Sequence, residues 1–206
     1  MRAEYAAVGL DESAAGDDPV ALFRKWLAEV VAAEVIEPNA MALATADADG
    51  APSVRTVLLK GLDAEGVVFF TNYDSRKGFE LAANPRAAAV MLWHPLQRQV
   101  RVEGAVTKLS PEESDAYFAS RPHGSQLGAA ASPQSQPVVD RAELEERYAQ
   151  VAAKFGTAAV PRPPYWGGYR IGFDVVEFWQ GRVNRMHDRI RFRRVEDGWE
   201  RGRLAP

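Results

Sequence analysis

The segment at residues 177–194 has the sequence EFWQGRVNRMHDRIRFRR and is unusually rich in arginine. Eight arginines lie within residues 182–203, in a chain whose formal net charge is −3. Arg185, His187 and Arg189 occupy alternate positions, and alternate side chains of a β-strand project from one face. The pattern therefore predicts a strand with these three side chains in a row. The pattern alone does not distinguish between two interpretations: a ligand-binding site, or a solvent-exposed edge strand whose charges prevent pairing with other strands.

The composition indicates a single globular domain. The 206 residues, 47% hydrophobic and 26% charged, suffice for one substantial core. The absence of cysteine excludes disulfides, and the three scattered histidines argue against a metal site. No apolar run approaches the roughly 20 residues that span a bilayer, and the N-terminus lacks the apolar core of a signal peptide. We therefore expect a cytoplasmic, metal-free, single-domain protein over residues 1–206, with residues 1–17 a flexible segment.

The acidic balance also limits the partners. A general nucleic-acid-binding protein normally carries a basic excess over the domain, whereas this chain has 25 basic and 28 acidic residues. We expect neither nucleic acid nor a membrane as a partner.

From residue 40 onward, short β-prone segments alternate with turns. Strands of this length with turn signals about every ten residues are typical of an antiparallel sandwich or barrel. The segments are MALATA, SVRTVLLK, GVVFFTN, RAAAVMLWH, QRQVRVEGAVTKL and, later, YWGGYRIGFDVVEFW. Strands on both sides of the helical segments predict one mixed, β-rich (α+β) domain, because a barrel removes the exposed edges that separate hairpins would leave.

Helix signals interrupt this pattern at three places. Asp18-Pro19 has the form of an N-cap followed by proline at the first helical position. Residues 110–113, Ser-Pro-Glu-Glu, form a capping box, and Asp140 begins a charged helix that ends near Gly156. Residues 121–138, RPHGSQLGAAASPQSQPV, have the composition of a flexible linker.

Three clusters contain residues that bind anions. Residues 55–60 place Arg55 and Lys60 on one predicted strand, and residues 71–78 place hydroxyls and two cations before a short helix. Tyr117, Arg121 and Ser125 follow at spacings of four. Each cluster alone is typical of ordinary surface, but together they indicate a phosphorylated ligand. Walker, dinucleotide and Gly-x-Ser-x-Gly motifs are absent, so the residues predict a β-rich phosphoanion-binding protein that is not a hydrolase.

The order of the motifs resembles the pyridoxine (pyridoxamine) 5′-phosphate oxidase family. The motifs that carry this resemblance are RTVLLK, FFTNYDSRKG, RQVRVEG, YFASRPHGSQLGAAASPQSQ, WGGYR, EFWQGRVNRMHDR and a closing RLAP. The family implies an FMN-binding split β-barrel of Greek-key type and a homodimer with two sites at the subunit interface. It also implies oxidation of pyridoxine and pyridoxamine 5′-phosphates to pyridoxal 5′-phosphate by O2, with release of H2O2, and of ammonia from the amine. This reaction is the last step of vitamin B6 cofactor synthesis.

The resemblance also assigns roles to individual residues. Cofactor contacts fall on Arg55, Thr56, Val57, Leu58, Lys60, Phe70, Thr71, Ser75, Arg76, Lys77, Gln99, Gln134, Ser135, Trp179 and Arg189, several of them from across the interface. Substrate contacts fall on Arg2, Tyr5, Lys60, Tyr117, Arg121, Ser125, Arg185 and His187. Arg185 and His187, over the pyridine ring, form the candidate catalytic pair. Phe70 stands where the family often has tyrosine.

Two alternatives stay open at this point. One is another split-barrel flavoprotein, such as a phenazine-pathway oxidase or a deazaflavin-dependent reductase. The other is a non-catalytic flavin or pyridoxal-phosphate carrier, whose ligand residues would be the same. Turnover of pyridoxine 5′-phosphate with release of peroxide separates both from the oxidase.

Overall fold

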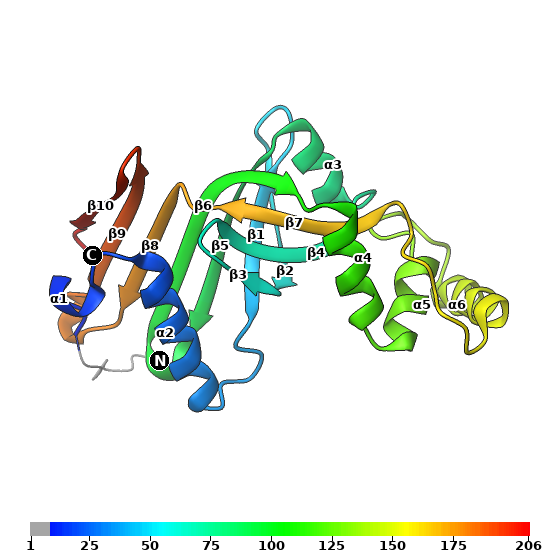
Figure 1. The fold of residues 1–206 in the computed structure, drawn as a ribbon, viewed down its shortest axis with the longest axis horizontal. Helices are drawn as coiled ribbons and strands as arrows, with labels where there is room; N and C mark the ends of the chain where they lie inside the picture. Colours follow the sequence, from blue (N-terminus) through cyan, green and yellow to red (C-terminus); the bar gives the residue numbers. More distant parts are fainter. Residues whose placement is uncertain (1–8) are drawn as a thin grey trace.

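The computed structural model describes residues 9–206 and contains a single curled antiparallel sheet with helices around it (Figure 1). The strand order is β10-β9-β8-β6-β5-β1-β2, and β7 joins β6 to β4, which also pairs with β3. The strands are β1 Ala40–Ala46, β2 Pro52–Leu58, β3 Gly61–Leu62, β4 Gly66–Asn72, β5 Arg86–Trp93, β6 Arg98–Lys108, β7 Trp166–Gly172, β8 Val175–Gln180, β9 Asp188–Val195 and β10 Gly198–Arg203. The predicted β-rich antiparallel architecture is confirmed.

The long strand β6 joins the two parts of the sheet. Its first half, residues 98–103, pairs with β8, and its end, residues 106–108, pairs with β7. Between them lies Gly104, where a Cβ atom would stand 1.9 Å from the carbonyl oxygen of Gly172. Any side chain there would collide with backbone, so glycine permits the close approach at which β6 passes from one partner to the other.

Residues 9–206 form six α-helices, and three of them begin at the predicted capping signals. The six helices are α1 Glu12–Ala15, α2 Pro19–Ala32, α3 Arg76–Ala83, α4 Pro111–Ser120, α5 His123–Ala131 and α6 Arg141–Phe155. Asp18 accepts from the backbone N–H of Val20 at 2.8 Å, and the predicted capping box at Ser110 forms with Glu113. Asp140 caps α6, and Gly156 follows its last residue. These local interactions fix the helix ends independently of tertiary packing.

The main core lies between α2 and the sheet. Phe23 and Trp26 on α2 are almost completely buried against Trp93 of β5 and Phe178 of β8. The rings of Trp26 and Phe178 meet edge to face, with 5.2 Å between their centroids. Burial of such aromatic side chains supplies the largest hydrophobic contributions in a core, and it fixes the β5–β6–β8 region as a rigid base.

The prediction that Arg185, His187 and Arg189 share one strand is wrong. Asn184 and Arg185 have φ values of 56° and 60°, which lie in the left-handed region, and β9 begins only at Asp188. Residues 183–185 form a 3-10 turn, η2, between β8 and β9. A left-handed backbone interrupts strand alternation, so only Arg189 of the three projects from the sheet.

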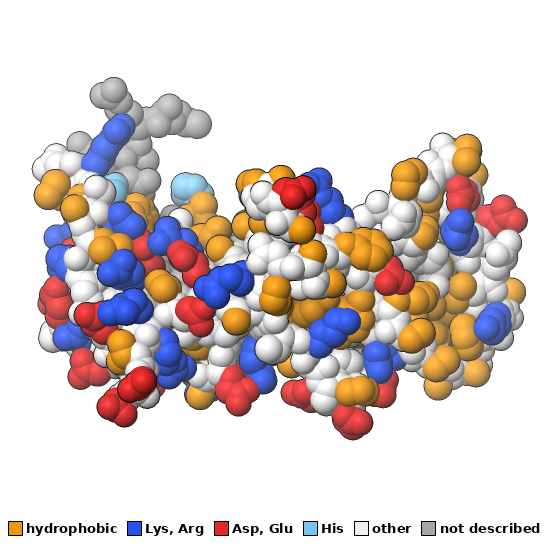
Figure 2. All heavy atoms as spheres, turned by 90° about the horizontal axis from the view of Figure 1, so that it is seen from above, with side chains coloured by type: hydrophobic (Ala, Val, Ile, Leu, Met, Phe, Trp, Pro, Cys, Tyr) orange, Lys and Arg blue, Asp and Glu red, His pale blue; other side chains and the backbone are white. Residues whose placement is uncertain are grey.

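Many arginines of β9 and β10 form ion pairs. Arg193 pairs with Glu200 across the hairpin, and Arg189 pairs with Glu177 at 2.8 Å. Arg203 contacts Glu12 at 2.8 Å and Asp188 at 2.7 Å, so it joins the N-terminal part of the described chain to β9. Figure 2 accordingly shows basic and acidic side chains interspersed at this end of the molecule. Charge balance between neighbours explains how an acidic protein carries so many arginines here.

The prediction of a linker at residues 121–138 is also wrong in its first half. Residues 123–131 form α5, whose Leu127 is buried with Phe118, Val160 and Trp166 in a second, smaller core. The sequence of this helix is rich in glycine and alanine and contains one large apolar residue, Leu127. It therefore shows no hydrophobic periodicity that would predict a helix. Within residues 9–206, no helix is long and apolar enough to span a membrane.

Candidate functional site

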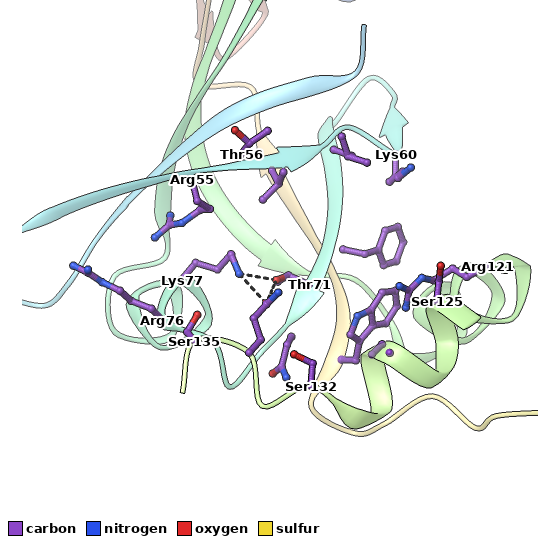
Figure 3. A pocket seen from close by; sticks show the side chains of 18 of the residues that line it. Arg55, Thr56, Lys60, Thr71, Arg76, Lys77, Arg121, Ser125, Ser132 and Ser135 are labelled. Atoms are coloured by element: carbon purple, nitrogen blue, oxygen red, sulfur yellow. Dashed lines mark hydrogen bonds between the residues drawn. The ribbon is translucent and has the colours of Figure 1, made fainter. Parts of the chain in front are cut away.

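A cavity of about 1010 Å³ lies between β2 and β4, which do not pair with each other in the described chain. The start of α3, the α4–α5 corner and the loop after α5 complete its wall (Figure 3). Most of the predicted ligand-binding residues line it: Arg55, Thr56, Val57, Leu58, Lys60, Phe70, Thr71, Arg76, Lys77, Tyr117, Arg121, Ser125, Gln134 and Ser135. The structure therefore brings together side chains that are up to eighty positions apart in the sequence.

Lys77 lies buried at one end of this cavity. Its Nζ donates to Thr71 Oγ1 at 2.9 Å and to Gln134 Oε1 at 3.0 Å (Figure 3), and also to Ser75 Oγ at 3.0 Å. All three acceptors are neutral. Burial, with a further contribution from the charge of Arg55, lowers the pKa of Lys77 to about 8. An anion that enters the cavity would stabilise this ammonium group and raise its pKa again.

Arg55 and Arg76 stand beside Lys77 and share one buried carboxylate, Glu80. Arg55 Nη2 lies 3.0 Å from Glu80 Oε2, and Arg76 Nε lies 2.8 Å from Glu80 Oε1. The hydroxyls of Thr45 and Ser53 also donate to this carboxylate. Burial acts to raise the pKa of Glu80, but these hydrogen bonds together lower it to about 2. Glu80 is therefore ionised at neutral pH.

The other end of the cavity has an aromatic wall and a separate cation. Phe70 stacks on Tyr117 with 3.8 Å between ring centroids and on Trp166 with 5.5 Å. The Arg121 guanidinium lies 4.7 Å from the Trp166 ring, and burial lowers the pKa of Arg121. Its Nη1 is buried without a hydrogen-bond partner among residues 9–206. A buried guanidinium with a free donor is suited to an anionic ligand.

A second group of predicted residues lies on β6, β8, β9 and the segment between β8 and β9, apart from the cavity wall. Trp179 pairs in register with Gln99 on one side and with Arg189 on the other. The His187 ring lies 4.6 Å from the Trp179 ring, and its Nδ1 accepts a backbone N–H at 3.1 Å. This second group, none of which lines the cavity, consists of Gln99, Trp179, Arg185, His187 and Arg189. One chain thus carries two separate parts of the predicted site.

Three predicted residues need separate mention. Ser75 does not line the cavity but lies beneath it, where its hydroxyl caps α3 and accepts from Lys77. Arg2 and Tyr5 lie outside the described residues.

Among the residues of the cavity and its support that the sequence analysis missed are Ser53, Glu80 and Trp166. Ser53 and Trp166 line the cavity, and Glu80 lies behind Arg55 and Arg76. The spacing of four between Arg76 and Glu80 on a predicted helix was the available signal for that ion pair. Nothing local marked Ser53 or Trp166, because their roles depend on strands that meet only in the folded chain.

A curled antiparallel sheet that is open between β2 and β4, with several cations lining the opening, places the chain in the class of split-barrel proteins. The family model described as pyridoxamine 5′-phosphate oxidase matches residues 27–155. A second model, the pyridoxine 5′-phosphate oxidase C-terminal dimerisation region, matches residues 166–206. The chain belongs to the pyridoxamine 5′-phosphate oxidase family. No group of three or more His, Asp or Glu residues in the described part of the chain is placed to hold a metal.

Similar proteins agree with this assignment. The chain is 55% identical over its whole length to a pyridoxine/pyridoxamine 5′-phosphate oxidase of Rubrobacter xylanophilus, of which it covers 95%. Among solved structures, it is similar to PhzG from Burkholderia lata in complex with tetrahydrophenazine-1-carboxylic acid. That likeness has a TM-score of 0.92 and 33% identity, and covers 99% of this chain and 100% of PhzG. An FMN-binding protein of Nostoc punctiforme, at 16% identity and a TM-score of 0.72 over 89% of this chain and 97% of its own, shares the fold.

Proposed function

We propose that this protein is an FMN-dependent oxidase that converts pyridoxine and pyridoxamine 5′-phosphates to pyridoxal 5′-phosphate. Molecular oxygen is the acceptor, hydrogen peroxide is released, and the amine substrate also releases ammonia. The observation that carries this proposal is the presence of two separate cationic groups in one cavity. Arg55, Arg76 and Lys77 stand at one end and Arg121 at the other (Figure 3), which suits one phosphate on a cofactor and one on a substrate.

The chain's own residues fit FMN in charge and shape. Arg55, Arg76 and Lys77 would hold the phosphate of FMN, and residues 55–58 of β2 would run along the FMN molecule. FMN, when bound, would supply the hydride acceptor that no side chain provides. Tyr117, Arg121 and Ser125 would bind the substrate phosphate and so place the reacting carbon. Phe70 stacks its ring on Tyr117 and Trp166 in the aromatic wall of the cavity.

We further propose that the complete site forms between two copies of the chain. The cavity would belong to one protomer, and residues 185–189 with Gln99 and Trp179 would come from its partner. Arg185 would lie against the substrate ring, His187 would hydrogen-bond its ring hydroxyl, and Arg189 would contact the flavin. The match to a dimerisation region over residues 166–206, which include every member of this second group except Gln99, supports the arrangement.

The shared site predicts complementation between two variants of low activity, assayed at an FMN concentration below the Kd of the Lys77 variant. Lys77→Met removes a residue from the cavity, and Arg185→Ala removes one from the second group. Unfolding and refolding the two variants together should give mixed dimers with one intact site and one doubly altered site. Random pairing should then restore about a quarter of wild-type activity per protomer, because half the dimers are mixed. Each variant refolded alone is the control, and no recovery in the mixture would place each complete site within one chain.

The experiment that tests the function is turnover of pyridoxine 5′-phosphate by the purified flavin-replete protein. Pyridoxal 5′-phosphate and hydrogen peroxide should appear in equal amounts, and acid or heat should release FMN from a yellow protein. Bound FAD, or a colourless protein indifferent to flavin, would contradict the cofactor. Flavin binding without turnover would identify a carrier, and turnover confined to a reduced phenazine carboxylate would identify a relative of PhzG.

Replacing Arg121 by alanine should chiefly raise KM. The guanidinium lies at the end of the cavity away from Lys77 (Figure 3), and gripping the phosphate stabilises bound substrate and transition state alike. We expect KM for pyridoxine 5′-phosphate to rise by about ten- to a hundredfold with kcat nearly unchanged, the loss of one or two charge-assisted hydrogen bonds. Steady-state kinetics measure this, with Arg141→Ala on the exposed face of α6 as control. A fall in kcat at constant KM would assign Arg121 to the chemistry instead.

A further inference from the structure

The two buried acidic side chains within residues 9–206 are Glu80 and Glu177. Each of them holds two arginines. Glu177 binds Arg189 at 2.8 Å and Arg101 at 2.8 Å, whereas Glu80 binds Arg55 at 3.0 Å and Arg76 at 2.8 Å. Three of these four arginines belong to the predicted cofactor site. Buried carboxylates in this protein therefore coincide with arginines at the site, one carboxylate in each of its two parts.

Glu80 is the more informative case because it stands next to three cations at the cavity. A negative charge close to an anion site opposes the ligand, and burying a carboxylate is itself unfavourable. If the cations served only to attract an anion, we would expect a neutral side chain at position 80. A carboxylate is nevertheless present here. Glu80 is buried, with 6% of its surface exposed, and it accepts hydrogen bonds from two hydroxyls and two guanidinium groups. Its presence requires a benefit that exceeds the repulsion.

The contacts of the two arginines indicate that benefit. Arg76 has a side chain that is 64% exposed, and its Nε donates to Glu80. Within the described chain, that bond is its one hydrogen bond to another residue, so without Glu80 the side chain would be free to turn into solvent. Arg55 is held on the opposite side of the same carboxylate, with further bonds to the carbonyl of Leu43 and the hydroxyl of Thr45. The carboxylate thus fixes two guanidinium groups from two different elements, β2 and α3, at one end of the cavity.

We propose that Glu80 is a positioning residue that holds Arg55 and Arg76 ready for the phosphate of the cofactor. The inference rests on the proposed function in that it takes FMN as the ligand of this end of the cavity. Fixing long side chains before binding lowers the conformational entropy lost when the phosphate arrives. The repulsion from Glu80 is small by comparison, because its charge is already compensated by two guanidinium groups within 3.0 Å.

The substitution Glu80→Gln tests this with little change of shape. The amide can still accept from one arginine and can donate to the Ser53 or Thr45 hydroxyl, so the buried position keeps hydrogen-bond partners and the fold should persist. The matched control is Glu145→Gln on α6. There Arg141 Nε lies 2.8 Å from Glu145 Oε1 with the same spacing of four, but on an exposed helix face.

The measurement is titration of the flavin-free proteins with FMN and with riboflavin, which lacks the phosphate. Glu80→Gln should raise the Kd for FMN by about tenfold or more, the loss of one charge-assisted bond, and leave the Kd for riboflavin within about twofold. Glu145→Gln should change neither. Equal weakening of both flavins would show a purely structural role, and unchanged or tighter FMN binding would show that repulsion dominates. Either result overturns the proposal while leaving the proposed function intact.

A double-mutant cycle locates the effect. In an Arg76→Ala background, Glu80→Gln should raise the Kd for FMN by markedly less than in the wild type, because part of what it positions is already missing. Independent, multiplicative effects would mean that Glu80 does not act through Arg76. If the wild-type protein binds riboflavin and FMN equally, or neither, the assignment of this cavity end to a phosphate fails together with the proposed cofactor.

Discussion

Arg185→Ala is expected to lower kcat/KM for pyridoxine 5′-phosphate by about 10²-fold or more, the scale of effects seen when a reacting group loses its position. Arg185 sits in the left-handed turn η2, beside the β8–β9 ladder that holds Trp179 and Arg189. Arg185 is exposed in this turn, and in the proposed dimer it would reach a substrate across the subunit boundary. A guanidinium there would hold the ring flat and stabilise charge that develops as hydride leaves.

The same substitution should leave bound FMN at its normal amount, because Arg185 is assigned to substrate. Alanine retains a Cβ atom, so the energy of the left-handed backbone changes little. His187→Ala should cost less, since the imidazole adds a hydrogen bond to a substrate already held by Arg185. Arg191→Ala, an exposed arginine on β9, is the control and should be silent. Steady-state kinetics on flavin-replete proteins decide the matter. An Arg185→Ala enzyme with wild-type kcat/KM would show that this arginine belongs only to a solvated edge.

Lys77→Met is expected to raise the Kd for FMN by about 10²-fold. One charge-assisted hydrogen bond contributes about 1.5–3 kcal/mol, or roughly ten- to a hundredfold in affinity. The variant also removes the ammonium that joins Thr71, Ser75 and Gln134, so the loop that carries Gln134 loses its tie to α3 but keeps the 3.1 Å hydrogen bond from Thr71 Oγ1 to Gln134 Oε1. Lys25→Met on the exposed face of α2 is the matched control. Fluorescence titration of the flavin-free proteins gives both values, and equal affinities would remove Lys77 from the phosphate site.

The pH dependence of the same titration identifies the group. Without ligand the pKa of Lys77 is about 8, and a bound phosphate raises it. The cationic form binds the anion, so affinity should be level below about pH 8 and fall as the pH rises above it. The fall should approach tenfold per pH unit until the pKa of the complex is reached. Lys77→Met should show no such fall between pH 8 and 9. A wild-type affinity that is flat over this range would contradict the assignment.

Local signals in the sequence were sufficient for the helix ends and the strand texture. Asp18, Ser110 and Asp140 cap their helices through contacts with residues two or three positions away, and such contacts do not depend on the rest of the chain. The alternation of short β-prone segments and turns likewise indicated an antiparallel, β-rich domain. The motif order indicated the family, together with most of the residues that line the cavity.

Local signals failed where the backbone left its regular conformation or where distant segments met. Alternation predicted one row for Arg185, His187 and Arg189, but two consecutive left-handed residues end that row before β9 begins. The helix α5 escaped notice because its stability comes from packing of Leu127 in a second core, and small residues carry no hydrophobic period.

The sequence by itself determined the fold class and the N-terminal ends of α2, α4 and α6. Each of these depends on residue types and on spacings of a few positions. Only the tertiary structure decided that the predicted ligand residues fall into two separate groups on one chain, and that Glu80 ties two of the cations together. The physical reason is that the cavity lies where β2 and β4 do not pair, and β6 carries Gln99 away from it to β8 and β9. Which strands pair is set by burial and hydrogen bonding over the whole sheet, and no short segment contains that information.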